Sequence, residues 1–86
     1  MNNVIKITDN NSLIKQIQPV IKRCRKGSFV YIICRKKKHT TMLKKVLPIF
    51  RITNKRGIYT YKGIIVIDNK KRKRFINYFD EVIELQ

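Results

Sequence analysis

The sequence predicts an α+β fold in which strands and helices follow one another in the order β-α-β-β-α-β. Two observations lead to this prediction. Apolar residues alternate with polar ones or form short β-branched runs in four segments, and they recur at helical spacings in two others. The 86 residues, of which 43% are hydrophobic, have the length of one small domain, and no composition break marks a linker.

The first third of the chain predicts a strand, a helix and a second strand. Residues 4–8 (VIKIT) alternate as a half-buried strand does, and residues 9–12 (DNNS) offer side chains that cap a helix. Apolar residues then follow at spacings of three and four until Gly27, although Pro19 predicts a kink or break between Lys15 and Pro19. Residues 28–34 (SFVYIIC) are typical of a buried strand.

Residues 35–57 are predicted to form a long basic loop. An alternative remains open here, because residues 40–47 (TTMLKKVL) also fit a two-turn helix that ends before Pro48. Short apolar patterns do not decide between a helix and an irregular segment.

The last third of the chain predicts a strand, a helix and a final strand. Residues 58–67 (IYTYKGIIVI) form the strongest strand pattern, in which Gly63 is a candidate bulge. Residues 70–79 fit a short helix capped by Asp68 or Asn69, and residues 80–85 fit a strand with Val82 and Ile83 on opposite faces. These elements suit one four-stranded sheet with both helices on one face. We therefore predict the ferredoxin-like split β-α-β arrangement for a single domain spanning residues 1–86.

The charge of the chain predicts a polyanionic partner. Lys and Arg number 21 against 5 Asp and Glu, which gives a formal net charge of +16. Nucleic acid is the leading partner class, and the apolar content excludes a disordered basic tail. The longest wholly apolar runs are far shorter than the ~20 residues of a membrane span, so we expect no membrane association.

The cations fall into three groups. The loop at 35–57 carries nine cations and no acid, the run at 70–74 (KKRKR) opens the last helix, and a third set decorates the first helix. Cations are disfavoured at the positive end of a helix, so a bound phosphate would relieve the run at 70–74. The set on the first helix, Lys15, Lys22, Arg23, Arg25 and Lys26, fits a solvated face equally well. The predicted RNA-binding residues are Arg35, Lys36, Lys37, Lys38, His39, Lys44, Lys45, Arg51, Lys55, Arg56, Lys70, Lys71, Arg72 and Lys73.

The supply of catalytic groups is poor, and we predict that the chain is not an enzyme. Three of the five carboxylates lie in the last seven residues, and the single histidine, His39, sits among lysines. Cys24 and Cys34 are too few for a structural zinc site even with His39, and are predicted to be core thiols. No phosphate-binding glycine loop occurs, so we expect no cofactor and no small-molecule substrate.

The composition also bears on the compartment. Ile, Lys and Asn make up 36 of the 86 residues and Ala is absent, which is the bias of an A/T-rich genome such as many mitochondrial ones. The first residues lack the pattern of a transit or signal peptide. We therefore expect a mitochondrial protein encoded in the organelle, or otherwise a cytoplasmic one.

The segment RKKKHTTMLKK, followed by GIYTYKGIIVIDNKK, resembles the small-subunit ribosomal protein ten family. In that likeness Lys36 and Lys37 match the basic pair that enters the family's long loop, Thr41 and Leu43 match its ascending arm, and residues 58–67 match its third strand. The resemblance covers nearly the whole chain. It implies a structural constituent of the ribosomal small-subunit head, whose partners are ribosomal RNA and neighbouring small-subunit proteins.

Two other interpretations stay open. A helix at residues 40–47 would give the order β-α-β-α-β-β, as in a free-standing nucleic-acid-binding protein of archaeal chromatin or viral type. A helix at 40–47 with an extended 70–79 favours this interpretation, and the reverse pattern favours the ribosomal one. The third interpretation is an interaction factor whose basic faces bind an acidic protein.

Overall fold

The computed structural model describes residues 2–5, 9–47, 51–52, 56–60 and 62–86. Its elements in chain order are β1 (Asn2–Ile5), α1 (Asn10–Arg25), β2 (Phe29–Cys34), α2 (Lys37–Val46), β3 (Arg51–Ile52), β4 (Arg56–Thr60), β5 (Ile64–Asp68), α3 (Lys73–Ile76) and β6 (Glu81–Leu85). For β3 and β4 the description is that of the backbone.

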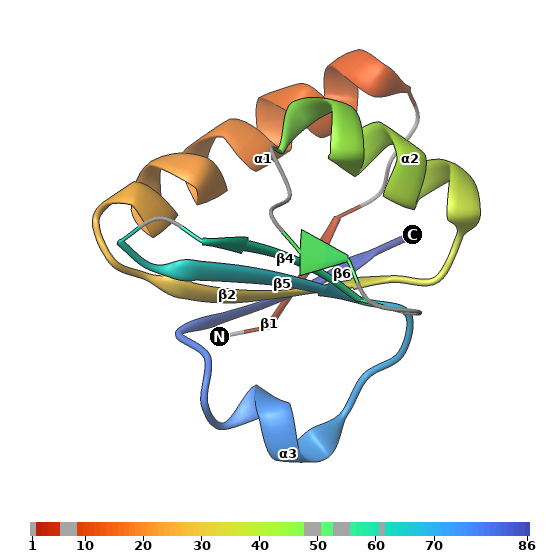
Figure 1. Ribbon diagram of the computed structural model, residues 1–86. Coiled ribbons are helices and arrows are strands. Elements are labelled where there is room, and N and C mark those ends of the chain that lie inside the picture. The colour runs from red at the N-terminus through yellow and green to blue at the C-terminus, as the bar shows by residue number, and fades with distance from the viewer. Residues whose placement is uncertain (1, 6–8, 48–50, 53–55, 61) are drawn as a thin grey trace.

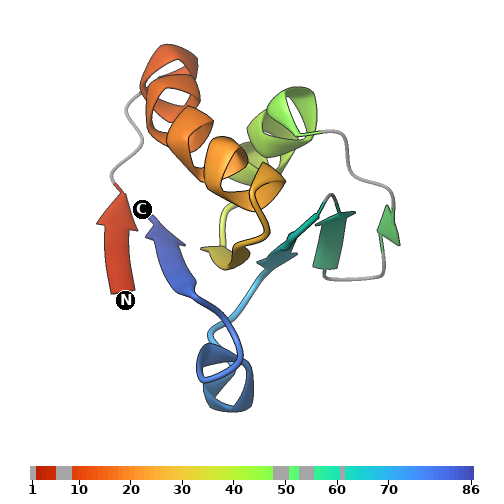
Figure 2. The same ribbon diagram turned by 90° about the vertical axis from the view of Figure 1, so that its left-hand side faces the viewer.

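The strands of the described residues form one mixed sheet in the order β1-β6-β2-β5-β4-β3. Figure 1 labels the strands other than β3, and Figure 2 shows them side by side across the sheet. The first four strands in this order are parallel, whereas β4 pairs antiparallel with β5 and β3 antiparallel with β4. The α+β class predicted from the sequence is confirmed. The finer prediction is not, because β2 and β6 lie side by side in parallel at the centre of a sheet with more strands than the split arrangement has.

Helices cover both faces of this sheet, with α1 and α2 on one side and α3 on the other (Figure 2). Under α1 and α2, a core of buried residues includes Val30, Ile32 and Ile83. Under α3, a smaller core contains Tyr31, Ile33 and Val82. Successive residues of β2 therefore enter opposite cores, which explains the continuous apolar run of this strand. The prediction that Val82 and Ile83 face opposite ways is confirmed.

Helix α1 begins and ends as the sequence predicts. The carboxylate of Asp9 accepts a hydrogen bond from the Ser12 N–H at 2.7 Å, which caps the N-terminus. At the other end Gly27 has a φ of 111°, and the N–H groups of Gly27 and Ser28 bond back to the last turn at 2.9 and 3.1 Å. Of the kink or break predicted between Lys15 and Pro19, the break does not occur, because α1 continues through Pro19. Pro19 is exposed, so water can bond the carbonyl group that its ring leaves without a partner.

Two segments differ from their predictions. The basic loop predicted for residues 35–57 contains helix α2, which buries His39 and Leu43 at a helical spacing of four. The strand predicted for residues 58–67 is a hairpin of β4 and β5. Its turn contains Gly63, whose N–H bonds to the Cys24 carbonyl oxygen at 2.9 Å. A Cβ at Gly63 would collide with the Ser28 carbonyl oxygen, so glycine allows this close approach of the hairpin to the end of α1.

The last third of the chain agrees with its prediction in part. The helix predicted for residues 70–79 is present only as the single turn α3, and its N-cap is Arg72, so the predicted cap by Asp68 or Asn69 is wrong. The predicted final strand is β6. Cys24 and Cys34 are both buried, as predicted, and burial raises the pKa of each thiol. These thiols pack in the core under α1 and α2.

Candidate nucleic-acid interface

The two basic clusters that lie far apart in the sequence meet at one edge of the sheet. Strands β2 and β5 are parallel neighbours, and Ile33 near the end of β2 is in register with Asp68 at the end of β5. The first cluster starts at Arg35, directly after β2, and the second starts at Lys70, two residues after the last residue of β5. Because parallel strands end at the same edge, both clusters leave the sheet there. We name them together the carboxyl-edge cluster: Arg35, Lys36, Lys37, Lys38, Lys70, Lys71, Arg72 and Lys73.

At this edge the two connections leave the sheet toward opposite faces. After β2 the chain continues into α2 on one face of the sheet, and after β5 it continues into α3 on the other face (Figure 2). In open sheets of this kind, ligands bind in the crevice outside the carboxyl ends of two such neighbouring strands. The carboxyl-edge cluster lies on both sides of that position.

Glu84 ties the two clusters together. One of its carboxylate oxygens lies 3.4 Å from Nη1 of Arg35, and the other lies 2.9 Å from Nζ of Lys71. The hydrogen bond from Lys71, followed by the contact with Arg35, lowers the pKa of Glu84 below its usual value despite partial burial. One carboxylate therefore holds one cation from each cluster at a short distance. Lys36, Lys37, Lys38, Lys70 and Lys73 of the cluster are exposed to solvent.

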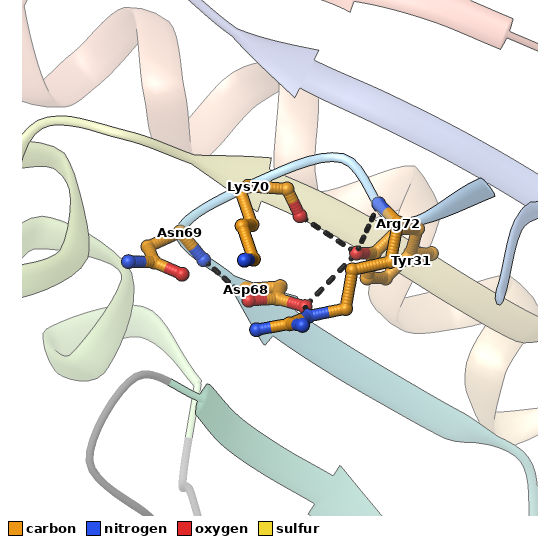
Figure 3. Close-up of polar contacts among 5 residues, drawn as sticks. All are labelled: Tyr31, Asp68, Asn69, Lys70 and Arg72. Atoms are coloured by element: carbon orange, nitrogen blue, oxygen red, sulfur yellow. Dashed lines mark hydrogen bonds and ion pairs between the residues drawn. The ribbon is translucent and has the colours of Figure 1, made fainter. Parts of the chain in front are cut away.

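Asp68 anchors the second cluster from below, as Figure 3 shows. This carboxylate is 1% exposed, and its Oδ2 accepts hydrogen bonds from the Tyr31 hydroxyl and from Nε of Arg72, both at 2.9 Å. Its Oδ1 accepts from the N–H of Asn69 at 2.8 Å. Burial alone would raise the pKa of Asp68, but the bonds from Tyr31, Arg72 and Asn69 outweigh it, and the net pKa is lowered.

Tyr31 fixes the backbone of the same segment. Its hydroxyl lies 2.8 Å from the carbonyl oxygen of Lys70 and accepts a hydrogen bond from the N–H of Arg72 at 3.2 Å. A hydroxyl has a single proton, so Asp68 and the Lys70 carbonyl share one donor. Burial, and then the contact with Asp68, raise the pKa of Tyr31. The result is a basic segment whose backbone is bonded to the centre of the sheet.

The N-terminus of α2 lacks the groups that usually complement a helix start. Lys36 occupies the N-cap position without a side-chain hydrogen bond to the helix, and the first turn holds no acidic residue. Three consecutive cations at residues 36–38 therefore stand at the positive end of the helix dipole. A bound anion would satisfy both the exposed N–H groups and these cations.

The structure separates the predicted residues of α2 into an outer and an inner set. Lys37, Lys38, Lys44 and Lys45 are exposed on the outer face. His39 is only 2% exposed and packs inward, so it is not placed to touch a phosphate. Burial, and then the nearby Lys36 and Lys38, lower the pKa of His39, and its Nδ1 has no hydrogen-bond partner among the described residues.

For three of the predicted RNA-binding residues the structure describes no side chain. Arg51 is in β3 and Arg56 is in β4, where the backbone is described, and Lys55 lies outside the described residues. The strands β3 and β4 occupy the end of the sheet beyond β5.

Every acidic residue of the chain takes part in an internal contact. Asp9 caps α1, Asp68 anchors the segment after β5, and Glu84 joins the two clusters. Asp80 accepts a hydrogen bond from the N–H of Phe29 at 2.8 Å, and Glu81 binds Arg23 through two bonds of 2.6 and 2.8 Å. The carboxylates therefore serve the fold, and they counter only a small part of the positive surface.

Sequence reasoning missed Tyr31, Asp68 and Glu84. Each lies in a strand and has at least one partner 37 or more residues away, Asp68 for Tyr31 and Arg35 for Glu84, and only the strand register reveals those distant contacts. One signal was available, because Asp68 closes an apolar run directly before the basic cluster. A carboxylate at the end of a strand, shortly before a run of cations, is a candidate partner for those cations.

Further features bear on function. No group of three or more His, Cys, Asp or Glu residues suited to a metal ion occurs in the described part of the chain. Among the described residues, no helix has the length and apolar character needed to cross a membrane. No protein-family model, curated protein or solved structure matches the chain.

Proposed function

We propose that the chain is an RNA-binding structural protein of a ribonucleoprotein particle, and that the carboxyl-edge cluster is its main contact with RNA. One observation carries the proposal. Two basic segments, separated by more than thirty residues, converge where β2 and β5 end, and the chain's carboxylates are engaged within the fold. Such a surface gains free energy when its cations meet phosphates and release the counterions condensed on the nucleic acid.

The contacts expected at this surface are to phosphate and sugar groups. Lysine is a flexible point charge, and most of the cluster consists of lysines. Contacts of this type position a protein on RNA, whereas base contacts supply sequence readout. RNA shape would then provide most of the recognition.

Within this class we propose a constituent of the ribosomal small subunit, located in the mitochondrion and contacting ribosomal RNA and neighbouring small-subunit proteins. The net charge of +16 and the A/T-rich composition support this assignment. Membership of the small-subunit ribosomal protein ten family, with its split β-α-β arrangement, rests on the sequence likeness alone. The parallel pairing of β2 with β5 and β6 departs from that arrangement.

The binding proposal is tested by replacing Lys36, Lys37 and Lys38 together with Gln. If all three contact phosphate, the slope of log affinity against log salt should become shallower by about 2 to 3 units, because each lost contact removes roughly one unit. Lys62→Gln is the control, since this exposed lysine lies at the opposite edge of the sheet, before β5. An unchanged slope in the triple variant would mean that these lysines face solvent in the complex.

The ribosomal assignment needs a separate measurement. In extracts of the source organelle, the native protein should sediment with the small subunit at moderate salt. Recovery of the protein wholly apart from ribosomes would remove this assignment and leave RNA binding intact.

A second candidate function is supported by one element. Helix α2 (Lys37–Val46) is the feature that distinguishes a free-standing nucleic-acid-binding module of the archaeal chromatin type. The discriminating pattern is met only in half, because the segment expected to be extended contains α3. Under this alternative the protein would bind RNA and DNA duplexes with similar affinity and would be found free of ribosomes.

A further inference from the structure

The cations of this chain lie on two opposite faces of the sheet, and Lys70 and Lys73 of the carboxyl-edge cluster belong to the lower face. Figure 2 shows α1 and α2 side by side above the sheet and α3 alone below it. Lysines are exposed on the upper helices, and Lys73 and Arg74 are exposed on α3.

The upper face is a layer of lysines. In α1 the buried residues Leu13, Ile17, Val20 and Cys24 face the sheet. Lys15, Lys22 and Lys26 follow at spacings of seven and four, and all three are exposed on the opposite side of the helical turn. In α2 the exposed Lys44 and Lys45 continue this surface. We name these five residues the helix-layer lysines: Lys15, Lys22, Lys26, Lys44 and Lys45.

The helix layer contains no carboxylate that could offset this charge. Neither α1 nor α2 has an acidic residue in its sequence. The solvated face of a helix usually mixes charges of both signs, because opposite charges three or four residues apart stabilise it. Arg23 of α1 is paired with Glu81 of β6. The charged residues of both helices, apart from His39, are all Lys or Arg, which is the pattern expected of a surface that meets phosphate.

The lower face is smaller but similar in character. Lys70 leads toward α3 and is exposed, and Lys73 and Arg74 follow in the helix. The Arg74 guanidinium lies 5.1 Å from the ring centroid of Phe75, which orients it on the helix surface. We name Lys70, Lys73 and Arg74 the lower cations.

The thickness of the molecule separates the two faces electrically. Its principal extents are 29 × 25 × 24 Å, whereas the Debye length at physiological ionic strength is about 8 Å. A phosphate bound on the helix layer would therefore contribute little to neutralising the lower cations. A single straight segment of RNA lying on one face would leave the other face uncompensated.

We infer that the chain bridges two segments of RNA, one held by the helix-layer lysines and the other by the lower cations. This inference rests on the proposed RNA-binding function and deepens it. The carboxyl-edge cluster joins the two faces, so each segment also has access to part of that cluster. The protein would then act as a cationic spacer that lets two phosphate backbones approach each other.

The test uses two short RNA hairpins of identical sequence, one labelled with a fluorescence donor and the other with an acceptor. With protein at half the RNA concentration, the wild-type chain should produce energy transfer. Sedimentation velocity should give the mass of one protein with two hairpins, which distinguishes bridging from a protein dimer with one hairpin on each copy.

Two matched triple variants locate the bound segments. One replaces Lys15, Lys22 and Lys44 with Gln, and the other replaces Lys70, Lys73 and Arg74 with Gln. Both variants should lose the energy transfer, and circular dichroism should show that both fold. The helix-layer variant should still bind one hairpin as wild type does, whereas the second variant, which removes Lys70 and Lys73 of the carboxyl-edge cluster, should bind one hairpin with a shallower salt dependence. Glutamine is chosen because it preserves helix propensity while removing the charge.

The outcomes separate the two proposals. A wild-type complex of one protein with one hairpin, without energy transfer, would overturn bridging and leave RNA binding standing. Energy transfer that persists in both variants would overturn the assignment to these two faces. A wild-type chain that binds neither hairpin at low salt would contradict the proposed function itself, and bridging with it.

Discussion

At the scale of single residues, the carboxylates determine how the cations are presented. Asp68 has the most buried position of the five and holds the backbone and side chain of the segment that follows β5. Removing one partner of a buried charged pair is costly, because the other charge is left without compensation. The geometry of the second basic cluster therefore depends on a residue that lies beneath it.

Asp68→Asn tests this dependence. The folded-state pKa of Asp68 is lowered, so its stabilising effect is present above the unfolded value near 4 and is lost as the pH falls through the folded value. At pH 7 the variant should lose about 3 kcal/mol of unfolding free energy. In urea denaturation, the difference in unfolding free energy between wild type and the variant should shrink as the pH is lowered from 5 toward the folded-state pKa of Asp68.

The control is Asp9→Asn, which keeps a good N-cap on α1 and should change the stability little. A difference between wild type and Asp68→Asn that stayed constant with pH would show that the ionised carboxylate is not the source of the stability.

At the scale of elements, α1 and β2 could be predicted because each carries its own signals. Asp9 and Gly27 mark the ends of α1, and β2 is a dense β-branched run. The helix α2 is short, begins at lysines and has no cap, so its local sequence argues weakly for a helix. It forms because His39, Leu43 and Leu47 reach the core, which is a tertiary effect.

The hairpin of β4 and β5 likewise depends on tertiary contacts that the local sequence does not reveal. Residues 58–67 alternate well enough to resemble one strand, and only the packing of Gly63 against the end of α1 reveals the turn. The place where the two basic runs meet is hidden for the same reason. The sequence contains both runs, but only a separate strand β5, parallel to β2, shows that they leave the sheet at one edge.

Lys36→Ser separates stability from binding at the start of α2. Serine at the N-cap supplies the missing acceptor and removes a cation from the positive end of the helix, so the unfolding free energy should rise by about 1 kcal/mol. RNA affinity should fall, because one phosphate contact is lost. Urea denaturation and a binding titration at fixed salt measure the two effects. Lys36→Ala is the control, and it should lose the same affinity with a smaller gain in stability.

If Lys36 contacts RNA from the start of α2, the Lys36→Ser variant should gain unfolding free energy and lose RNA affinity. A serine variant that is stabilised but binds RNA as well as wild type would place Lys36 outside the interface. A variant that gains no stability would mean that the helix start is already satisfied in another way.

At the scale of the whole molecule, the fold combines a small core with an unbalanced surface. The net charge is +16, and the acidic residues are committed to the internal contacts that hold the sheet edges and basic segments in place. Self-repulsion of this size destabilises a compact state. A polyanion that binds the folded chain would stabilise it by mass action.

This balance predicts that salt acts in opposite directions on folding and on binding. Sodium chloride screens the repulsion among exposed lysines, and it also weakens ion pairs such as Arg23–Glu81 and Lys71–Glu84. The cations of these pairs are substantially exposed, and such pairs contribute at most about 1 kcal/mol each, so relief of the repulsion should dominate. The melting temperature should therefore rise with salt over the same range in which RNA affinity falls.

The variant with Lys36, Lys37 and Lys38 replaced by Gln should show a smaller rise, because it carries less charge. A melting temperature that fell with salt would mean that the ion pairs outweigh the repulsion and that the isolated fold does not need a polyanion to neutralise it.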